Sequence, residues 1–188
     1  SSDLQKHLDK LGVLNADIAV INLEDGIAPQ KKEEALFAAS DAISKLKESK
    51  AKIAVRTNPM DSPYFDKELE VLNALSPDAI RVPKIRSVED VLRLEMLIEQ
   101  DIEIHLSIET KEALASLSRL KTSDRVTTVF LGAIDLLEDL ELGSHLIDNF
   151  SDTLKYIMCK FLVDAKTAGF KPFSFVYQNH IDIDGFKK

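Results

Sequence analysis

Val129-Phe130-Leu131-Gly132-Ala133-Ile134-Asp135 is an apolar, β-prone run that stops at a glycine and presents a carboxylate three residues later. An earlier run, 102–108, ends in the same way at Glu109, and a helical pattern follows Thr110. Because the carboxyl ends of parallel strands lie at one edge of a sheet, the two acids could hold a divalent cation together. Each could instead cap the helix that follows its strand. The residues alone leave both interpretations open.

Short apolar runs alternate with amphipathic stretches along the chain, which is typical of βα units in a parallel sheet. We expect strands at 16–23, 53–55, 79–82, 102–108, in a run that ends at 131, and at 173–177. We expect helices at 3–11, 31–46, 65–75, 88–99, 111–120 and 154–168. A β/α barrel and a doubly wound sheet would both place ligands at the strand carboxyl ends.

The composition is that of an acidic globular protein. The 188 residues are 45% hydrophobic and carry a net charge of −8, which disfavours nucleic acid and acidic membrane surfaces as partners. No run approaches the ~20 apolar residues of a membrane span, and the start shows no signal-peptide pattern. We therefore expect a cytoplasmic protein with one domain over residues 1–188.

Five short motifs follow one another along the chain: Leu23-Glu24-Asp25, Arg56-Thr57-Asn58-Pro59, Val82-Pro83-Lys84, Ile108-Glu109-Thr110 and Leu131-Gly132-Ala133-Ile134-Asp135-Leu136. In order and spacing they resemble the HpcH/HpaI aldolase and citrate lyase β-subunit family, especially its CitE-like branch. The resemblance runs from about Asp17 to Phe186. It implies a TIM-type (β/α)8 barrel that makes or breaks a carbon–carbon bond next to a carbonyl with Mg²⁺.

The resemblance also implies roles for the polar strand ends. Glu109 and Asp135 would hold Mg²⁺, and Arg56 would bind the substrate carboxylate or the developing enolate oxygen. Glu24 and Asp25 would lie beside the metal. From the residues alone, Arg56 could also simply pair with Glu24 or Asp25 across the end of the sheet, which is compatible with a substrate role.

A second group of residues would contact the substrate and coenzyme A. The resemblance places Gly132, Pro83 and Lys84 at the substrate site, and Lys31 or Lys32 where some relatives meet CoA phosphates. The residue pattern by itself favours an exposed helix start for the two lysines.

The chain also departs from the family pattern. Asn22 stands where the first acid of Asp-Leu-Glu-Asp is usual, and Ser174 replaces an aspartate. A complete barrel usually takes ~250 residues, so about six βα units are visible here. The family's first strand and C-terminal segment are lacking, so either the barrel is incomplete or flanking segments are missing. Incomplete closure exposes strand edges, and we therefore expect a homo-oligomer.

The resemblance, with its ligand residues retained, implies a Mg²⁺-dependent carbon–carbon lyase. Its expected substrate is a CoA thioester of a small hydroxy acid, of the citryl-CoA or malyl-CoA type, cleaved to an oxo acid and acetyl-CoA. One alternative is an aldolase that acts on a free hydroxy-oxo acid. Another is a non-catalytic binding or assembly subunit that kept the metal site.

Overall fold

The structure is a computed structural model that describes residues 17–46, 50–143, 145–148 and 151–174. Its strands form one sheet in the order β1-β2-β3-β4-β5-β6, and every neighbouring pair is parallel. The strands are β1 (Ile18–Asn22), β2 (Lys52–Arg56), β3 (Ala79–Val82), β4 (Glu103–Ile108), β5 (Val126–Leu131) and β6 (Lys171–Phe173).

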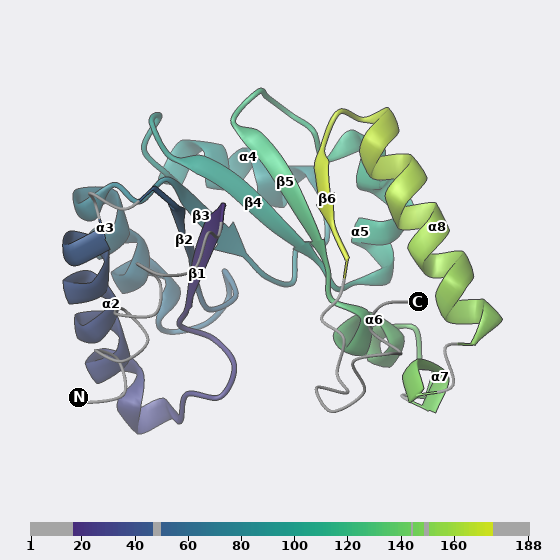
Figure 1. The fold of residues 1–188 in the computed structure, drawn as a ribbon, viewed down its shortest axis with the longest axis horizontal. Helices are drawn as coiled ribbons and strands as arrows, with labels where there is room; N and C mark the ends of the chain where they lie inside the picture. Colours follow the sequence, from purple (N-terminus) through teal and green to yellow (C-terminus); the bar gives the residue numbers. More distant parts are fainter. Residues whose placement is uncertain (1–16, 47–49, 144, 149–150, 175–188) are drawn as a thin grey trace.

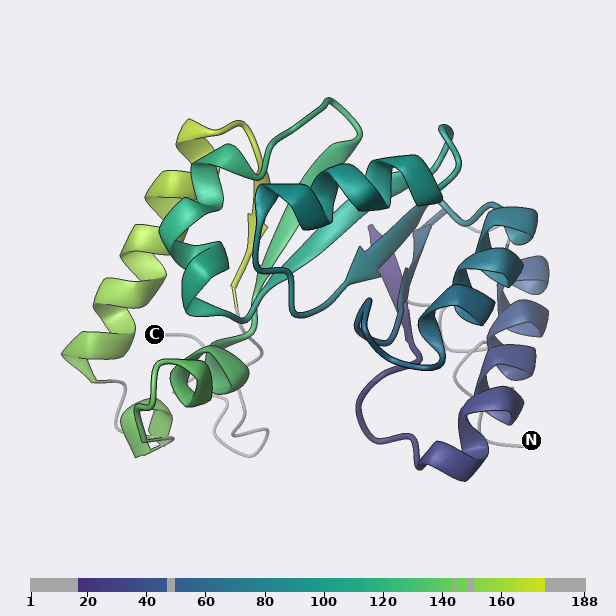
Figure 2. The ribbon, with the colours of Figure 1, turned by 180° about the vertical axis from the view of Figure 1, so that it is seen from behind.

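Helices connect successive strands along the outer side of this curved sheet (Figures 1 and 2). They are α2 (Lys32–Leu46), α3 (Phe65–Leu75), α4 (Val88–Leu97), α5 (Lys111–Ser116), α6 (Ala133–Asp139), α7 (His145–Asp148) and α8 (Asp152–Thr167), with short 3₁₀ turns η1 (Pro29–Lys31) and η2 (Leu117–Arg119). A doubly wound sheet reverses its strand order and carries helices on both faces. Sequential order with helices outside is instead the topology of a β/α barrel, here an incomplete one.

The two faces of the sheet carry different side chains. On β4, Ile104, Leu106 and Ile108 are fully buried in the hydrophobic core. The alternate residues His105 and Ser107 form polar contacts on the other face, as the two-residue period of a strand requires. The core therefore lies between sheet and helices, and the inner face is free to carry polar chemistry.

Local signals set several element ends as expected. Ser87 and Asp90 form a reciprocal capping box at the start of α4. Gly169, with φ +86°, follows the end of α8, where the Phe170 N–H donates to the Ala165 carbonyl. None of the helices in the described ranges is long and apolar enough to cross a membrane.

The structure also differs from the expected elements. The sequence pattern did not indicate α6 or α7, because segments of seven and four residues are too short to show a helical period. The last described strand lies at Lys171–Phe173 and contains Pro172, which an edge position tolerates. Most of the expected strand 173–177 lies outside the described residues, which end at Ser174. The expected helix 3–11 and the motifs at 176–177 and 185–186 lie outside the described residues.

Candidate active site

Arg56 is the centre of a charged cluster at the carboxyl edge of the sheet. Its Nη1 lies 3.0 Å from Asp25 Oδ2, and its Nη2 lies 3.2 Å from Glu109 Oε1 and also forms an ion pair with Glu24 Oε2. The side chains of Arg56, Glu24 and Glu109 are 13%, 8% and 2% exposed. The pairing of Arg56 with Glu24 and Asp25 that the sequence left open is therefore present, and β1, β2 and β4 all contribute to it.

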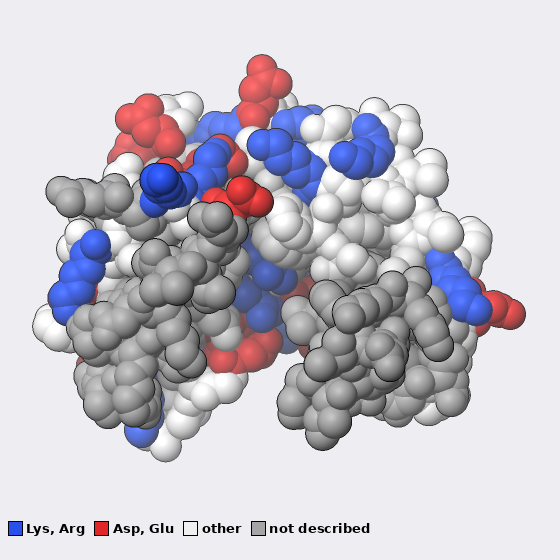
Figure 3. Space-filling model, in the orientation of Figure 1, with Lys and Arg blue, Asp and Glu red and all other residues white. Residues whose placement is uncertain are grey.

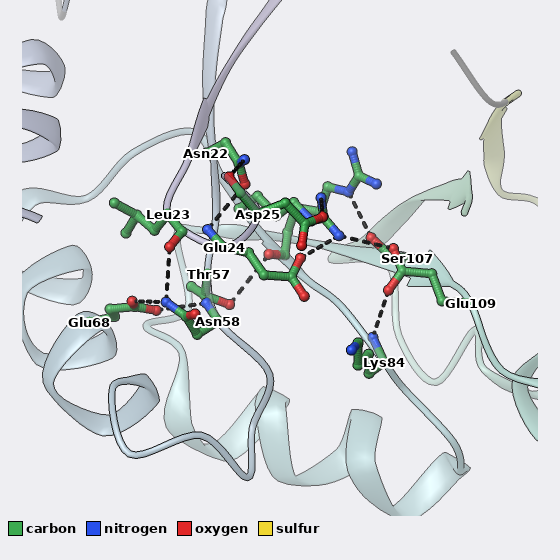
Figure 4. A network of polar contacts seen from close by, with 12 residues as sticks. Asn22, Leu23, Glu24, Asp25, Thr57, Asn58, Glu68, Lys84, Ser107 and Glu109 are labelled. Carbon is green, nitrogen blue, oxygen red and sulfur yellow. Dashed lines mark hydrogen bonds and ion pairs between the residues drawn. The ribbon is translucent and has the colours of Figure 1, made fainter. Parts of the chain in front are cut away.

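Glu109 is held by two neighbouring strand ends. The backbone N–H of Lys84 donates to Glu109 Oε2 at 3.2 Å (Figure 4), and Lys84 adopts a left-handed conformation with φ +54° directly after the buried Pro83. A Cβ at Gly132 would lie 2.2 Å from Glu109 Cγ. Only a glycine there leaves room for this carboxylate.

The capping interpretation is wrong for Glu109. Thr110 is the N-cap of α5, and its Oγ1 accepts a hydrogen bond from the Ala113 N–H. Glu109 is therefore not used by the following helix, and its carboxylate remains directed at Arg56 and the Lys84 N–H.

Asp135 lies in the first turn of α6 and is half-buried. Within the described residues its carboxylate makes no hydrogen bond or ion pair, and Gly132, the N-cap, provides no side-chain cap. Asp135 lies close enough to Glu109 for its negative charge to raise the pKa of Glu109. Two carboxylates from β4 and α6 thus approach one another at this edge.

The electrostatics of the cluster favour an added cation. Burial raises the pKa of Glu24 to about 7, which Arg56 opposes and Asp25 and Glu109 reinforce. Burial also raises the pKa of Glu109 against the effect of Arg56. Burial is the larger cause for both groups, so the raised pKa values mainly reflect removal of the charged carboxylates from water, to which the neighbouring acids add. A cation bound beside them would stabilise their charged forms.

The carboxylates of this cluster fit a Mg²⁺ site in which the protein provides only two ligands. Among the described residues, no group of three His, Cys, Asp or Glu side chains is placed to hold a metal ion. Mg²⁺ commonly takes one or two carboxylates and fills its remaining positions with water and substrate oxygens. Glu109 and Asp135 provide the two carboxylates that this coordination requires. Figure 3 shows charged side chains of both signs in a hollow on the open side of the sheet.

The model of the HpcH/HpaI aldolase/citrate lyase family matches residues 1–188. The chain belongs to this family. The β subunit of citrate lyase from Leuconostoc mesenteroides subsp. cremoris is 26% identical over 187 residues, which are 93% of this chain and 61% of that protein. An L-malyl-CoA/β-methylmalyl-CoA lyase from Cereibacter sphaeroides is 22% identical over 206 residues, with 95% of this chain and 65% of that protein covered. The chain thus spans about three-fifths of the length of these curated relatives.

Solved structures of the family share the fold. The citrate lyase β subunit from M. tuberculosis, complexed with oxaloacetate and magnesium, superposes with a TM-score of 0.82 at 21% identity, covering 99% of this chain and 80% of that one. A citrate lyase from Burkholderia xenovorans LB400 gives 0.83 at 20% identity, covering 98% and 64%. The expected TIM-type barrel, incomplete in the described residues, is confirmed.

Asn22, which replaces the usual acid of this family, folds the turn that presents Glu24 and Asp25. Its Oδ1 accepts from the Glu24 N–H at 3.2 Å, and its Nδ2 donates to the Asp25 carbonyl at 2.9 Å (Figure 4). An aspartate could accept the first bond but could not donate the second. Asn22 therefore makes both hydrogen bonds of this turn without adding a negative charge.

Lys32 occupies a different place from the one expected. Its Nζ is buried and donates to the carbonyls of Leu23 and Glu24 at 2.7 and 2.6 Å and to Asn58 Oδ1 at 2.8 Å. An ammonium has three N–H donors, so none remains for a CoA phosphate. The exposed helix start expected for Lys32 is wrong, because the first turn of α2 packs against the β1 turn. Lys31 is exposed.

The sequence analysis missed the roles of three residues near the site. Asn58 bonds to Glu68 and to the Leu23 carbonyl, so α3 supports the turn after β1 (Figure 4). Lys32 supports the same turn through its bonds to the Leu23 and Glu24 carbonyls. The third residue is Arg81, which lies inside the short apolar strand β3. A charged residue in a strand otherwise built of buried residues was the available signal for Arg81.

Proposed function

We propose that this chain forms the metal-binding and oxo-acid-binding edge of a Mg²⁺-dependent carbon–carbon lyase that acts on the CoA thioester of a small hydroxy acid. The convergence of Glu109, Asp135 and Arg56 at one strand edge is the observation that supports it. The matched relatives are named citrate lyase subunit beta, malyl-CoA lyase and citramalyl-CoA lyase, which supports a citryl-CoA or malyl-CoA type of substrate.

Glu109 and Asp135 are the proposed metal ligands. Mg²⁺ bound there would supply Lewis-acid stabilisation of the negative charge that develops on the oxo-acid oxygen. Glu109 is kept in place for this role by the Lys84 N–H and by the space above Gly132. Glu24 and Asp25 would lie beside the metal and orient Arg56.

Arg56 is the proposed partner of the substrate oxygens. Cleavage of a bond β to a carbonyl leaves an enolate, and fixed positive charge near that oxygen lowers the barrier. Because three carboxylates hold its two terminal nitrogens, the guanidinium plane of Arg56 is fixed before substrate arrives. A guanidinium also stays protonated throughout the working pH range.

The remaining proposed contacts surround this centre. Gly132, Pro83 and Lys84 would border the substrate, since all three adjoin Glu109 or its backbone contacts. The proposed contact for the CoA phosphates is Lys31, which is exposed at the end of η1. Lys32 is not proposed for this contact, because its ammonium is buried and already bonded.

Calorimetric titration of Mg²⁺, with and without oxaloacetate, tests this proposal. Wild type should bind Mg²⁺ more tightly when the oxo acid is present, and Asp135→Asn should weaken that binding at least tenfold. Glu138→Gln is the matched control, because Glu138 is an exposed acid of the same helix. Absence of Mg²⁺ binding in wild type, or equal binding in Asp135→Asn, would contradict the metal site.

A turnover screen then separates the candidate activities. Cleavage of citryl-CoA or malyl-CoA would support the lyase, whereas pyruvate release from a free hydroxy-oxo acid without CoA would indicate an aldolase. Metal binding with no turnover on either substrate class would indicate a binding subunit.

A further inference from the structure

Arg81 lies on the inner face of the sheet, next to Arg56. The strand register pairs the Cα of Arg81 with Arg56 on β2 and with His105 on β4. Its strand neighbours Ile80 and Val82 are fully buried in the core, so Arg81 is on the opposite face, where its Nε donates to Ser107 Oγ at 2.8 Å. An arginine with no assigned role therefore adjoins the proposed substrate site.

The guanidinium of Arg81 is fixed by stacking as well. Its Cζ lies 4.0 Å from the ring centroid of Phe130, and Phe130 stacks on Phe173 at 4.9 Å. Arg81 and Phe130 are on β3 and β5, roughly 10 Å apart, and they meet because the intervening β4 residue is the small Ser107. The stack and the single Nε bond orient the group without using its terminal nitrogens.

The outer edge of this guanidinium is unused in the described part of the chain. Neither Nη1 nor Nη2 of Arg81 makes a hydrogen bond or ion pair there, whereas the terminal nitrogens of Arg56 contact three carboxylates. Burial, followed by the nearby charge of Arg56, lowers the pKa of Arg81 to about 10, so the group is protonated at neutral pH. Two parallel N–H donors on a planar cation match a carboxylate.

We propose that Arg81 binds a second carboxylate of the substrate and thereby makes the site prefer dicarboxylic oxo acids to monocarboxylic ones. The inference rests on the proposed function, in which Arg56 and the metal edge take the first carboxylate and the oxo group. The same contact would favour hydroxy-acyl thioesters that retain a second free carboxylate.

Calorimetry with oxaloacetate and pyruvate at saturating Mg²⁺ tests Arg81, because the two oxo acids differ by one carboxylate. Wild type should bind oxaloacetate at least tenfold more tightly than pyruvate. Arg81→Met keeps an apolar stem over Phe130 and should weaken oxaloacetate about tenfold, the effect expected for a lost charged hydrogen-bond pair, with pyruvate within twofold. Arg81→Lys keeps the charge without the fork and should fall between.

The outcomes separate this inference from the proposed function. An oxaloacetate-to-pyruvate ratio that is equal in wild type and Arg81→Met, or an equal loss for both acids, would overturn the role of Arg81 alone. Wild type that binds neither acid would overturn the proposed function and this inference together. If Arg81→Met shows no cooperative thermal unfolding, Arg81→Lys decides, and an unchanged ratio in that variant would overturn the inference.

Discussion

Glu109 depends on a residue 23 positions later in the chain that has no side chain at all. The Cβ of an alanine at Gly132 would lie 2.2 Å from Glu109 Cγ, a separation that real Cβ atoms do not show. The position of the Glu109 carboxylate therefore requires a glycine at position 132. The glycine is required here for space rather than for a left-handed backbone.

Gly132→Ala should consequently damage the site more than the fold. We expect Mg²⁺ binding to weaken at least tenfold and stability to fall by about 1–3 kcal/mol, the usual cost of a forced clash. Calorimetry and urea unfolding measure the two effects. Gly169→Ala is the control, because φ there is +86° but nothing lies within 4 Å of its Cβ. It should lose stability and keep metal binding; equal metal binding by both variants would contradict the clash.

The buried Lys32 connects helix α2 to the segments that follow strands β1 and β2. From the start of α2 its ammonium bonds to two carbonyls of the turn after β1 and to Asn58 after β2. Glu68 of α3 completes the network through Asn58, and burial raises the pKa of Glu68. The turn that carries Glu24 and Asp25 is thereby attached to two helices.

Lys32→Met should be strongly destabilising, because it removes three buried hydrogen bonds, and only the Leu23 carbonyl keeps another donor, the Nδ2 of Asn58. We expect a loss of about 3 kcal/mol, measured by urea unfolding. The neighbouring exposed Lys31→Met is the matched control and should stay within about 0.5 kcal/mol of wild type. Similar stabilities for the two variants would show that the Lys32 contacts contribute little.

Glu103 links strands at the opposite end of the sheet. Its carboxylate accepts hydrogen bonds from Lys52 on β2 and Thr127 on β5 and contacts His105. Burial alone would raise its pKa, but these bonds together outweigh burial and lower it from 4.5 to about 2. A carboxyl whose pKa is lower in the folded state adds stability above pH 4.5 and loses it as pH falls toward 2.

Glu103→Gln should therefore flatten the acid side of the stability profile. Between pH 5 and pH 2.5, wild type should lose more stability than Glu103→Gln, and the two should differ most at neutral pH. Thermal unfolding across this range is the measurement, with the exposed Glu138→Gln as a control that should follow wild type. Parallel profiles for Glu103→Gln and wild type would refute the role of this carboxylate.

The sheet formed by the described residues has two edge strands. Within the described residues, β1 and β6 each pair with a single neighbour, and large apolar side chains such as Phe37 and Met96 are 79% and 81% exposed on the outer helices. Unpaired strand edges and exposed apolar groups both favour association. We expect the 188-residue chain to self-associate, and sedimentation equilibrium at several concentrations measures this. A monomer at every concentration would contradict the expectation.

Most element positions followed from local pattern, because hydrophobic period, caps and strand-ending residues act over a few neighbours. The ends of α3 and β3, the Ser87 capping box and the acids at the ends of β4 and β5 were all readable in this way. The grouping of Arg56 with Glu24 and Asp25 was anticipated as one possibility. Metal ligation by Glu109 and Asp135 stays a prediction.

Contacts between distant residues decided the rest. Strand order distinguished the barrel from a doubly wound sheet, and no local pattern encodes which strands pair. Packing across 26 residues made Lys32 a buried partner of Asn58 instead of a surface lysine. Arg81 gained its aromatic and hydroxyl partners only when β3, β4 and β5 were placed side by side. These roles depend on which side chains the folded sheet brings within a few ångströms of one another. Local sequence patterns do not determine those contacts, because the partners are far apart along the chain.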